Sequence, residues 1–403
     1  SKLVAFGSTR RKKMLAKDDK QIGALVESGA PTICMVAKGH LWQVTDIIRA
    51  APEENLEMIR DSVSYLVSLG KRVFVDLEHF FDGFKFDEEY SLECCRAAVD
   101  AGASGLVLCD TNGGSMPWDV GSITNKIVNE FKDVTVGIHA HNDCGMALAN
   151  SVVAAKNGAG LVQGTINGIG ERTGNADLCS IVPTLALHVG SKVSCVDNMK
   201  NITSVSRFVD ETMNRQHHTA APFVGSSAFA HKGGLHVAAM ERSPMSYQHI
   251  DPGLVGNEKR ILISELSGRQ NIMGKIKELG GYDSLMTDEV VSERAVAILN
   301  RVKHLESIGY TFEGAEASVD VMILHATKGY CPPFTVLDYA TQVLDANLDP
   351  AFRELLSAGE PSDDSAFKTK LKKSGATTRA TVTIRTMLDV DDLVSGWEHT
   401  RDK

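Results

Sequence analysis

The sequence predicts an α/β protein whose first part is a (β/α)8 barrel, followed by a mostly helical region and the opening of an α+β domain. Short, β-branched apolar runs recur about every thirty residues, the length of one strand–helix unit, with helix-like patterns between them. Near-continuous apolar strands are typical of a parallel sheet covered by helices. At least four of these strands carry polar residues at their carboxyl ends, which favours a barrel over an open doubly wound sheet.

Six barrel strands are expected, at residues 2–6, 31–37, 71–78, 104–111, 134–141 and 160–170. The clearest intervening helix runs from Pro52 to Gly70, because it opens with proline and acidic residues and stops at glycine. A closed barrel of this type needs eight units. We therefore expect that the first two units are missing, that the natural product is longer at its N-terminus, and that these residues alone are inactive or poorly folded.

Three regions are predicted: a partial barrel at 1–188, helical linker subdomains at 189–322 and a partial regulatory domain at 323–403. Helical patterns at Val196–Arg215 and Thr287–Leu305 characterise the second region. The third has strand-like runs at 332–343 and 378–388, separated by a charged segment that predicts a solvated loop. Two strands and a loop cannot form an independent domain.

Composition narrows the function classes. The chain is 43% hydrophobic and 23% charged, with a formal net charge of −9, which argues against broad binding to nucleic acid or to anionic membranes. No apolar run approaches the roughly 18 residues of a membrane span, and the N-terminus has no signal-peptide pattern. The eight cysteines include no CxxC pair and predict buried, reduced thiols. We expect a cytoplasmic protein, with an organellar matrix or stroma left open.

Two histidines at the end of the fifth predicted strand indicate a metal site. His139 and His141 belong to the sequence HAHND, and residues two apart in a strand point to the same face. Glu78 and Asp110 end neighbouring strands. Imidazole with carboxylate or amide oxygen suits a divalent ion such as Mg, Mn or Zn, which could polarise a carbonyl group. Ordinary hydrogen bonding at a barrel mouth is the alternative.

The next segment, residues 164–185, is rich in glycine, which lets backbone approach a ligand closely. Glu171, Arg172 and Asn175 could orient anionic groups or bind the metal, and we assign Arg172 to substrate binding. An ordinary glycine-rich loop entering a helix is the alternative.

These two motifs together resemble the barrel family of 2-isopropylmalate, homocitrate and citramalate synthases, and more distantly hydroxymethylglutaryl-CoA lyase. The likeness covers residues 1 to about 340. Within the family, the citramalate synthase branch is the most similar, by FGSTRRK (6–12), VDLEHFFDGFK (75–85), LCDTNGG (108–114), LISELSGRQNI (262–272) and FEGAEAS (312–318).

The resemblance implies an acyltransferase that condenses acetyl-CoA with a metal-bound 2-oxo acid and then hydrolyses the thioester. With pyruvate the product is (R)-citramalate, on the route to isoleucine. The nearest alternative is 2-isopropylmalate synthase, which takes 2-oxoisovalerate and leads to leucine. An inactive truncated paralogue or assembly partner is an alternative of another class. A lyase is less favoured, because the run GIGERTGN has no cysteine.

Site residues follow from the same resemblance. His139 and His141 match the two histidine ligands, and Asn175 matches an asparagine at or near the metal. Thr111 aligns with a threonine that contacts the carboxylate of the oxo acid. Glu78 matches a glutamate that acts as general base or holds one.

Two residues of the second region match groups that reach the partner subunit's barrel in the family. His236 and Tyr247 are therefore expected to assist proton transfer there, which implies a homodimer. The pair His217–His218 has no such match and predicts the surface of a solvated helix. The basic run at residues 10–13 could meet the phosphates of CoA or form a solvated face.

The chain also departs from the family. The first-strand motif of the family, with an aspartate that binds the metal and an arginine that holds the oxo acid, does not occur in it. The metal would consequently lack a carboxylate ligand from that strand. The product-sensing domain of the family is represented only by its expected opening.

Overall fold

The computed structural model describes residues 3–231, 236, 239–240, 242–261, 263, 267–278, 288–312, 315–326, 335–345 and 378–387. The chain divides into two compact units, Ser1–Leu262 and Ile263–Lys403, which are described separately. The three-region division at residues 188 and 322 stays a prediction.

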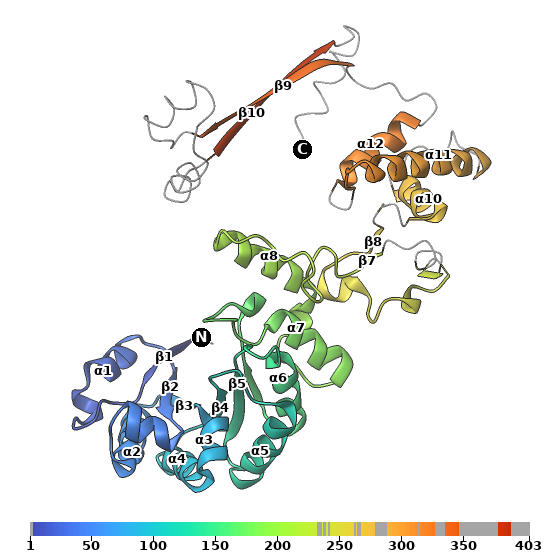
Figure 1. The fold of residues 1–403 in the computed structure, drawn as a ribbon. Coiled ribbons are helices and arrows are strands. Elements are labelled where there is room, and N and C mark those ends of the chain that lie inside the picture. The colour runs from blue at the N-terminus through green and yellow to red at the C-terminus, as the bar shows by residue number, and fades with distance from the viewer. Residues whose placement is uncertain are drawn as a thin grey trace. The chain divides into compact units, whose positions relative to one another are not determined.

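The first unit contains one parallel sheet of six strands in sequential order (Figure 1). The strands are β1 Val4–Ser8, β2 Thr32–Lys38, β3 Arg72–Glu78, β4 Gly105–Asp110, β5 Thr135–Ala140 and β6 Leu161–Gln163. Each strand pairs in parallel with the next one along the chain. Sequential order without a reversal is typical of a barrel, whereas a doubly wound sheet reverses at its switch point. The six predicted strands and the α/β class are confirmed.

Helices follow the strands and cover the outer face of the sheet (Figure 1). They are η1 Ala16–Asp18, α1 Lys20–Glu27, η2 Gln43–Ile47, α2 Pro52–Ser68, α3 Phe80–Phe86, α4 Glu88–Asp100, α5 Pro117–Glu130 and α6 Ala147–Lys156. The helix predicted from Pro52 is confirmed as α2, and Gly70 follows it at φ +74°. Apolar side chains of strands and helices form one core, with Ile33, Leu77 and Leu108 fully buried.

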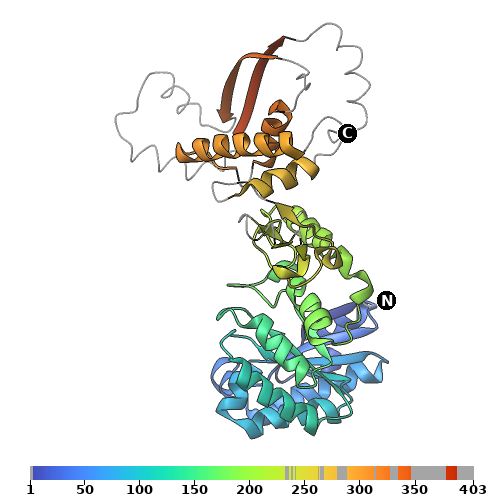
Figure 2. The ribbon, with the colours of Figure 1, turned by 90° about the vertical axis from the view of Figure 1, so that its right-hand side faces the viewer.

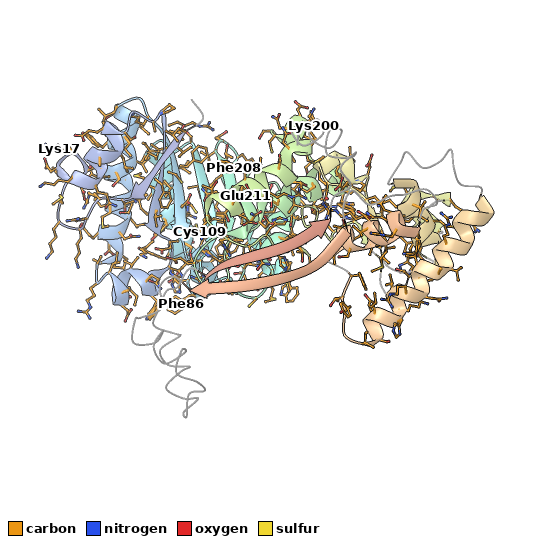
Figure 3. All side chains as sticks on the ribbon, turned by 90° about the horizontal axis from the view of Figure 1, so that it is seen from above. Lys17, Phe86, Cys109, Lys200, Phe208 and Glu211 are labelled. Atoms are coloured by element: carbon orange, nitrogen blue, oxygen red, sulfur yellow. The ribbon has the colours of Figure 1, made fainter. Side chains whose placement is uncertain are left out.

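A second core follows β6 within the same unit. It is built from η3 Ile166–Gly168, α7 Leu178–Pro183, η4 Thr184–Val189, η5 Val196–Asn201, α8 Ile202–Thr212, β7 Ala230–His231, η6 Pro244–Ser246, η7 Pro252–Val255 and β8 Arg260–Ile261. Its buried members include Cys179, Ile202 and Phe229. The helix predicted over Val196–Arg215 is confirmed as η5 and α8 from Val196 to Thr212, and residues 213–215 lie beyond its end. Figure 3 labels Lys200, Phe208 and Glu211 along this segment.

The prediction for His217 was wrong. This residue lies in coil beyond α8, and its side chain is half-buried. Its Nδ1 is 2.9 Å from Oδ2 of Asp210 and its Nε2 is 3.3 Å from the carbonyl oxygen of Val224. The ring therefore bridges α8 and the loop that follows it, a role set by how this loop folds back on the helix. His218 is exposed and also lies in coil.

The second unit contains helices and a strand pair. Its described elements are α10 Arg269–Glu278, α11 Asp288–Ser307, α12 Glu316–Ala326, β9 Thr335–Asp345 and β10 Thr378–Met387. The strands β9 and β10 form an antiparallel ribbon (Figure 2), which confirms the two predicted strand runs except residues 332–334 and 388, outside the described residues. The helix predicted over Thr287–Leu305 is confirmed as α11 from residue 288. The charged segment between the strands also lies outside the described residues.

The described cysteines are free thiols, and most of them are buried. The exceptions are Cys144 and Cys195, which are exposed, contrary to the prediction of buried thiols. Cys144 lies in the turn between β5 and α6 and Cys195 directly precedes η5, so neither belongs to the buried face of a strand or helix. Burial raises the pKa of the Cys94 thiol to about 12. Among the described helices, none has the length and apolar character needed to cross a membrane.

Candidate active site at the strand ends

The two histidines of the HAHND motif lie next to each other. His139 is in β5 and His141 directly follows it, with ring centroids 5.2 Å apart and a tilt of 44° between the rings. The backbone of His141 donates to the carbonyl oxygen of Asp110 at 3.2 Å and forms an isolated bridge with Asn175. The structure therefore brings together the three residues predicted to bind a metal.

Two buried polar atoms beside this bridge have no hydrogen-bond partner: Nδ1 of His141 and Oδ1 of Asn175. Buried polar atoms in proteins are nearly always hydrogen-bonded. Two such atoms without a partner, on residues joined by a backbone bridge, indicate a site for a ligand that both could bind. Imidazole nitrogen and amide oxygen both donate lone pairs to divalent cations. Burial lowers the pKa of His141, and a charge on His139 would lower it further, which favours the neutral ring that a metal needs.

The donor set is incomplete for a closed metal centre. Within the described part of the chain, no three His, Cys, Asp or Glu side chains cluster as a metal site. Two imidazoles and one amide fit a divalent ion as part of its shell and leave positions open for other ligands.

Glycines allow the loop after β6 to bring Asn175 to His141. Gly174 has φ +98°, and a Cβ there would lie 2.0 Å from the carbonyl oxygen of Gly168. A Cβ on Gly170 would lie 2.1 Å from Nδ2 of Asn175. The amide of Asn175 also donates from Nδ2 to the carbonyl oxygen of Ile169 at 3.1 Å. Only glycine permits these close approaches without displacing the asparagine.

Arg172 ties this loop to two other strand ends. Its Nε and Nη2 donate to the two carboxylate oxygens of Asp143 at 2.7 and 2.8 Å, and Nη2 also donates to the carbonyl oxygen of Thr111 at 2.7 Å. These hydrogen bonds from Arg172 lower the pKa of Asp143. Nε and Nη2 are thus engaged by the protein itself, whereas Nη1 takes no part in these hydrogen bonds. The assignment of Arg172 to substrate binding stays a prediction.

Thr111 lies half-buried at the end of β4. Its Oγ1 accepts a hydrogen bond from the backbone N–H of His79 at 2.8 Å. His79 connects β3 to α3 with φ +57°, a left-handed conformation, and burial lowers the pKa of its ring. Thr111 consequently joins the ends of β3 and β4, and its predicted contact with an oxo acid is not tested.

Glu78 ends β3 and forms an ion pair with Lys38, which ends β2. Both line a cavity of about 570 Å³ at this end of the sheet. Its other lining residues are Ser8, Thr9, Arg10, Arg11, Lys12, Val36, Ile48, Asn55 and Met58.

The basic run at residues 10–13 divides into two kinds of side chain. Arg10 is 4% exposed and pairs with Glu54 at 3.0 Å and with Asp61 at 2.7 Å. Arg10 is therefore not part of a solvated face, and its guanidinium group is not free to bind a phosphate. Arg11, Lys12 and Lys13 are exposed.

His236 and Tyr247 lie together in the second part of the first unit. Their rings stack with centroids 4.1 Å apart and planes 25° from parallel, and both side chains are exposed. An exposed His–Tyr pair could present a proton donor to a second molecule. Their role in a partner subunit stays a prediction.

Sequence reasoning missed two residues of the site, Gln163 and Asp76. Oε1 of Gln163 is 2.7 Å from Nδ1 of His139, and its Nε2 donates to Oδ1 of Asp76 at 3.0 Å. Burial raises the pKa of Asp76. The available signal was an acidic residue inside the apolar run VFVDLE, a pattern that buried strands rarely contain.

Comparisons with known proteins come from family models and from individual sequences. The model described as HMGL-like matches residues 7–209, and the model described as homocitrate synthase post-HMGL domain-like matches residues 223–309. A (R)-citramalate synthase of Aquifex aeolicus is 45% identical over 80% of this chain and 60% of that protein. A (R)-citramalate synthase of Synechocystis is 40% identical over 89% of this chain and 66% of that protein.

A 2-isopropylmalate synthase of Sulfolobus acidocaldarius is also similar, with 34% identity over 67% of this chain and 67% of that protein. The chain therefore spans between three-fifths and two-thirds of the length of these relatives.

Proposed function

The chain belongs to the HMGL-like family, and on this basis we propose that it is a citramalate synthase, which condenses acetyl-CoA with pyruvate to (R)-citramalate and CoA. The identity to citramalate synthases, 40–45%, exceeds the 34% to a 2-isopropylmalate synthase. The carrying observation is the bridge between His141 and Asn175, with an unpaired buried atom on each side chain. The proposed role is in isoleucine biosynthesis in the cytoplasm.

His139, His141 and Asn175 would hold the divalent ion, Mg, Mn or Zn. When bound, such an ion supplies Lewis-acid polarisation of the keto group of pyruvate. The remaining chemistry needs a base for the methyl group of acetyl-CoA, carbon–carbon bond formation at C2 of pyruvate, and attack of water on the thioester with release of CoA.

Glu78 is the proposed base, directly or by holding another group. It ends β3 beside a cavity large enough for a small acid and part of a thioester. Its partner Lys38 lies at the end of β2, so abstraction of a proton requires the carboxylate to exchange Lys38 for the substrate methyl group. Thr111 and Arg172 are the proposed contacts of the pyruvate carboxylate. Arg172 would also keep the loop closed through Asp143.

The direct test offers the full-length protein acetyl-CoA with pyruvate and, in parallel, with 2-oxoisovalerate, and measures free thiol. We expect faster CoA release with pyruvate. A preference for 2-oxoisovalerate would establish the 2-isopropylmalate synthase alternative, since a few pocket side chains set the choice between these acids. No thiol release with either acid, together with no retained divalent ion after dialysis, would indicate an inactive paralogue.

We also propose a homodimer in which His236 and Tyr247 act in the barrel of the partner, with residues 189–322 as linker and 323–403 as the start of a regulatory domain. The match of a post-HMGL domain to residues 223–309 supports the linker. Co-expression of a His236→Ala chain with a His139→Ala chain tests the dimer. If His236 acts across subunits, the mixed dimer contains one intact site and regains activity that either variant lacks alone. Action within one subunit predicts no recovery.

A further inference from the structure

A hydrogen-bonded chain inside the barrel connects three strands to one predicted metal ligand. Asp76 of β3, Gln163 of β6 and His139 of β5 form it, with distances of 3.0 Å between Asp76 and Gln163 and 2.7 Å between Gln163 and His139. The thiol of Cys34 donates to the same oxygen of Asp76 at 2.9 Å. Asp76 is 3% exposed, so bulk water does not replace these partners.

The direction of each hydrogen bond in this series follows from which group can donate a proton. Oδ1 of Asp76 accepts from the Cys34 thiol and from a second donor, which must be the NH₂ of Gln163. The amide then turns its carbonyl oxygen toward Nδ1 of His139. Because a carbonyl oxygen only accepts, Nδ1 must carry the proton. In a neutral imidazole this leaves the lone pair on Nε2.

We propose that Gln163 and Asp76 are positioning residues that hold His139 with its proton on Nδ1, so that Nε2 can bind the divalent ion; this inference rests on the proposed function. A flipped amide would present its NH₂ to Nδ1 and its oxygen to the carboxylate of Asp76. With the NH₂ group facing Nδ1 of His139, the proton of the ring would lie on Nε2, where it prevents metal binding. With the amide oxygen facing the carboxylate of Asp76, two hydrogen-bond acceptors would face each other and repel. Asp76 thereby selects the orientation of Gln163, and Gln163 selects the tautomer of His139.

The two histidines differ in the hydrogen bonding of Nδ1. Its Nδ1 has no hydrogen-bond partner, whereas Nδ1 of His139 is held by Gln163. A change at Gln163 should therefore affect one imidazole directly and leave the other unchanged. Outer hydrogen-bond partners of this kind commonly contribute 10- to 100-fold to metal affinity.

The experiment replaces Gln163 in the full-length protein by Met and, separately, by Glu. Gln163→Met keeps the side-chain length and removes both hydrogen bonds, to Asp76 and to His139, together with the longer contact from Nε2 to Sγ of Cys34 at 3.7 Å. Gln163→Glu restores both if the new carboxyl group donates its proton to Asp76 and accepts from Nδ1 of His139. Thr203→Val is the matched control. It also removes one buried hydrogen bond, from Thr203 Oγ1 to the carbonyl oxygen of Val255, but neither residue contacts Gln163, Asp76 or His139 by a hydrogen bond.

Two measurements are made on each protein. ¹⁵N NMR of histidine-labelled, metal-free protein reports the tautomer of His139, and calorimetric titration with Mn²⁺ reports affinity. We expect the Nδ1–H form in the parent, in Gln163→Glu and in Thr203→Val. Gln163→Met should show a tautomer mixture at His139 and a Kd for Mn²⁺ raised roughly 10- to 100-fold.

The inference is overturned if the parent carries the Nε2–H form, or if Gln163→Met leaves tautomer and Kd unchanged. The proposed function fails differently: Mn²⁺ binds and His139 has the Nδ1 proton, but the parent releases no CoA with either oxo acid.

Discussion

Arg172 donates from Nε and Nη2 to both carboxylate oxygens of Asp143, over 2.7 and 2.8 Å, and so joins the loop after β6 to the turn after β5. The same Nη2 reaches the carbonyl oxygen of Thr111 beyond β4. Three strand ends that carry predicted site residues are therefore held by one guanidinium group. Its role in the position of Asn175, three residues further along, can be tested.

Replacing Arg172 by Lys keeps the positive charge and removes the two-pronged contact. We expect kcat/KM for pyruvate to fall roughly 10- to 100-fold, because small displacements of positioning groups have effects of this size. The free energy of unfolding should change little, since the ion pair is exposed to solvent.

Arg96→Lys is the matched control, because Arg96 also bridges two carboxylates, Glu89 and Glu130, away from the strand ends. It should lower neither kcat nor kcat/KM. Equal activity losses in the two variants would contradict a specific role for the Arg172 contact.

The strands and their polar ends were predictable because both follow from local sequence. A run such as PTICMVA is apolar on both faces, and this pattern is typical of strands in a parallel sheet that helices cover. The role of Gln163 was not predictable in this way. In GLVQGT it is the first polar residue before a loop, and only the pairing of β5 with β6 places it opposite His139. The burial of His217 was not predictable either. Its partners Asp210 and Val224 lie seven residues before and after it, and only the folding of the loop back on α8 brings the three together.

Alanine substitutions at the two histidines should remove the metal. We expect His139→Ala and His141→Ala each to weaken binding of Mn²⁺, and the double variant to retain no stoichiometric ion after dialysis, because both imidazole ligands are then absent. Elemental analysis of the dialysed full-length protein provides the measurement. His218→Ala serves as the control, since this side chain is exposed and lies in coil. Undiminished metal content in the double variant would refute the site.

Gly174→Ala should distort the loop that carries Asn175. The new Cβ would lie 2.0 Å from the carbonyl oxygen of Gly168, and φ +98° is strained for any residue with a side chain. We expect a loss of at least about 1–2 kcal/mol in the free energy of unfolding and weaker binding of Mn²⁺. Thermal unfolding and metal titration measure the two effects.

Gly114→Ala is the comparison, because no atom lies within 4 Å of its built Cβ and its φ is not in the left-handed region. It should be nearly neutral in both measurements. If the two alanine variants behave alike, the close approach at Gly174 does not hold Asn175 in place.

His79 should make stability depend on pH. Burial lowers the pKa of its ring below the ordinary value of 6.5. As pH falls through 6.5, the unfolded chain takes up a proton that the folded chain resists, so the unfolded state is favoured. The contribution of His79 to the free energy of unfolding is therefore fully present above pH 6.5 and is lost as the pH falls toward the lowered pKa of the folded state.

Replacing His79 by Asn removes the titrating ring and keeps a residue that tolerates φ +57°. Urea unfolding of both proteins at pH 7.5, 6.0 and 5.0, from about one unit above the ordinary pKa of 6.5 to about 1.5 units below it, gives the difference in stability at each pH. Histidines of lowered pKa that have no charge interaction with His79, such as His249, contribute equally to both proteins and cancel in this difference. We expect the variant to gain on the parent as pH falls. A difference that is constant across the three pH values would mean that His79 titrates alike in the folded and unfolded chains, and burial at the end of β3 could not then explain its behaviour.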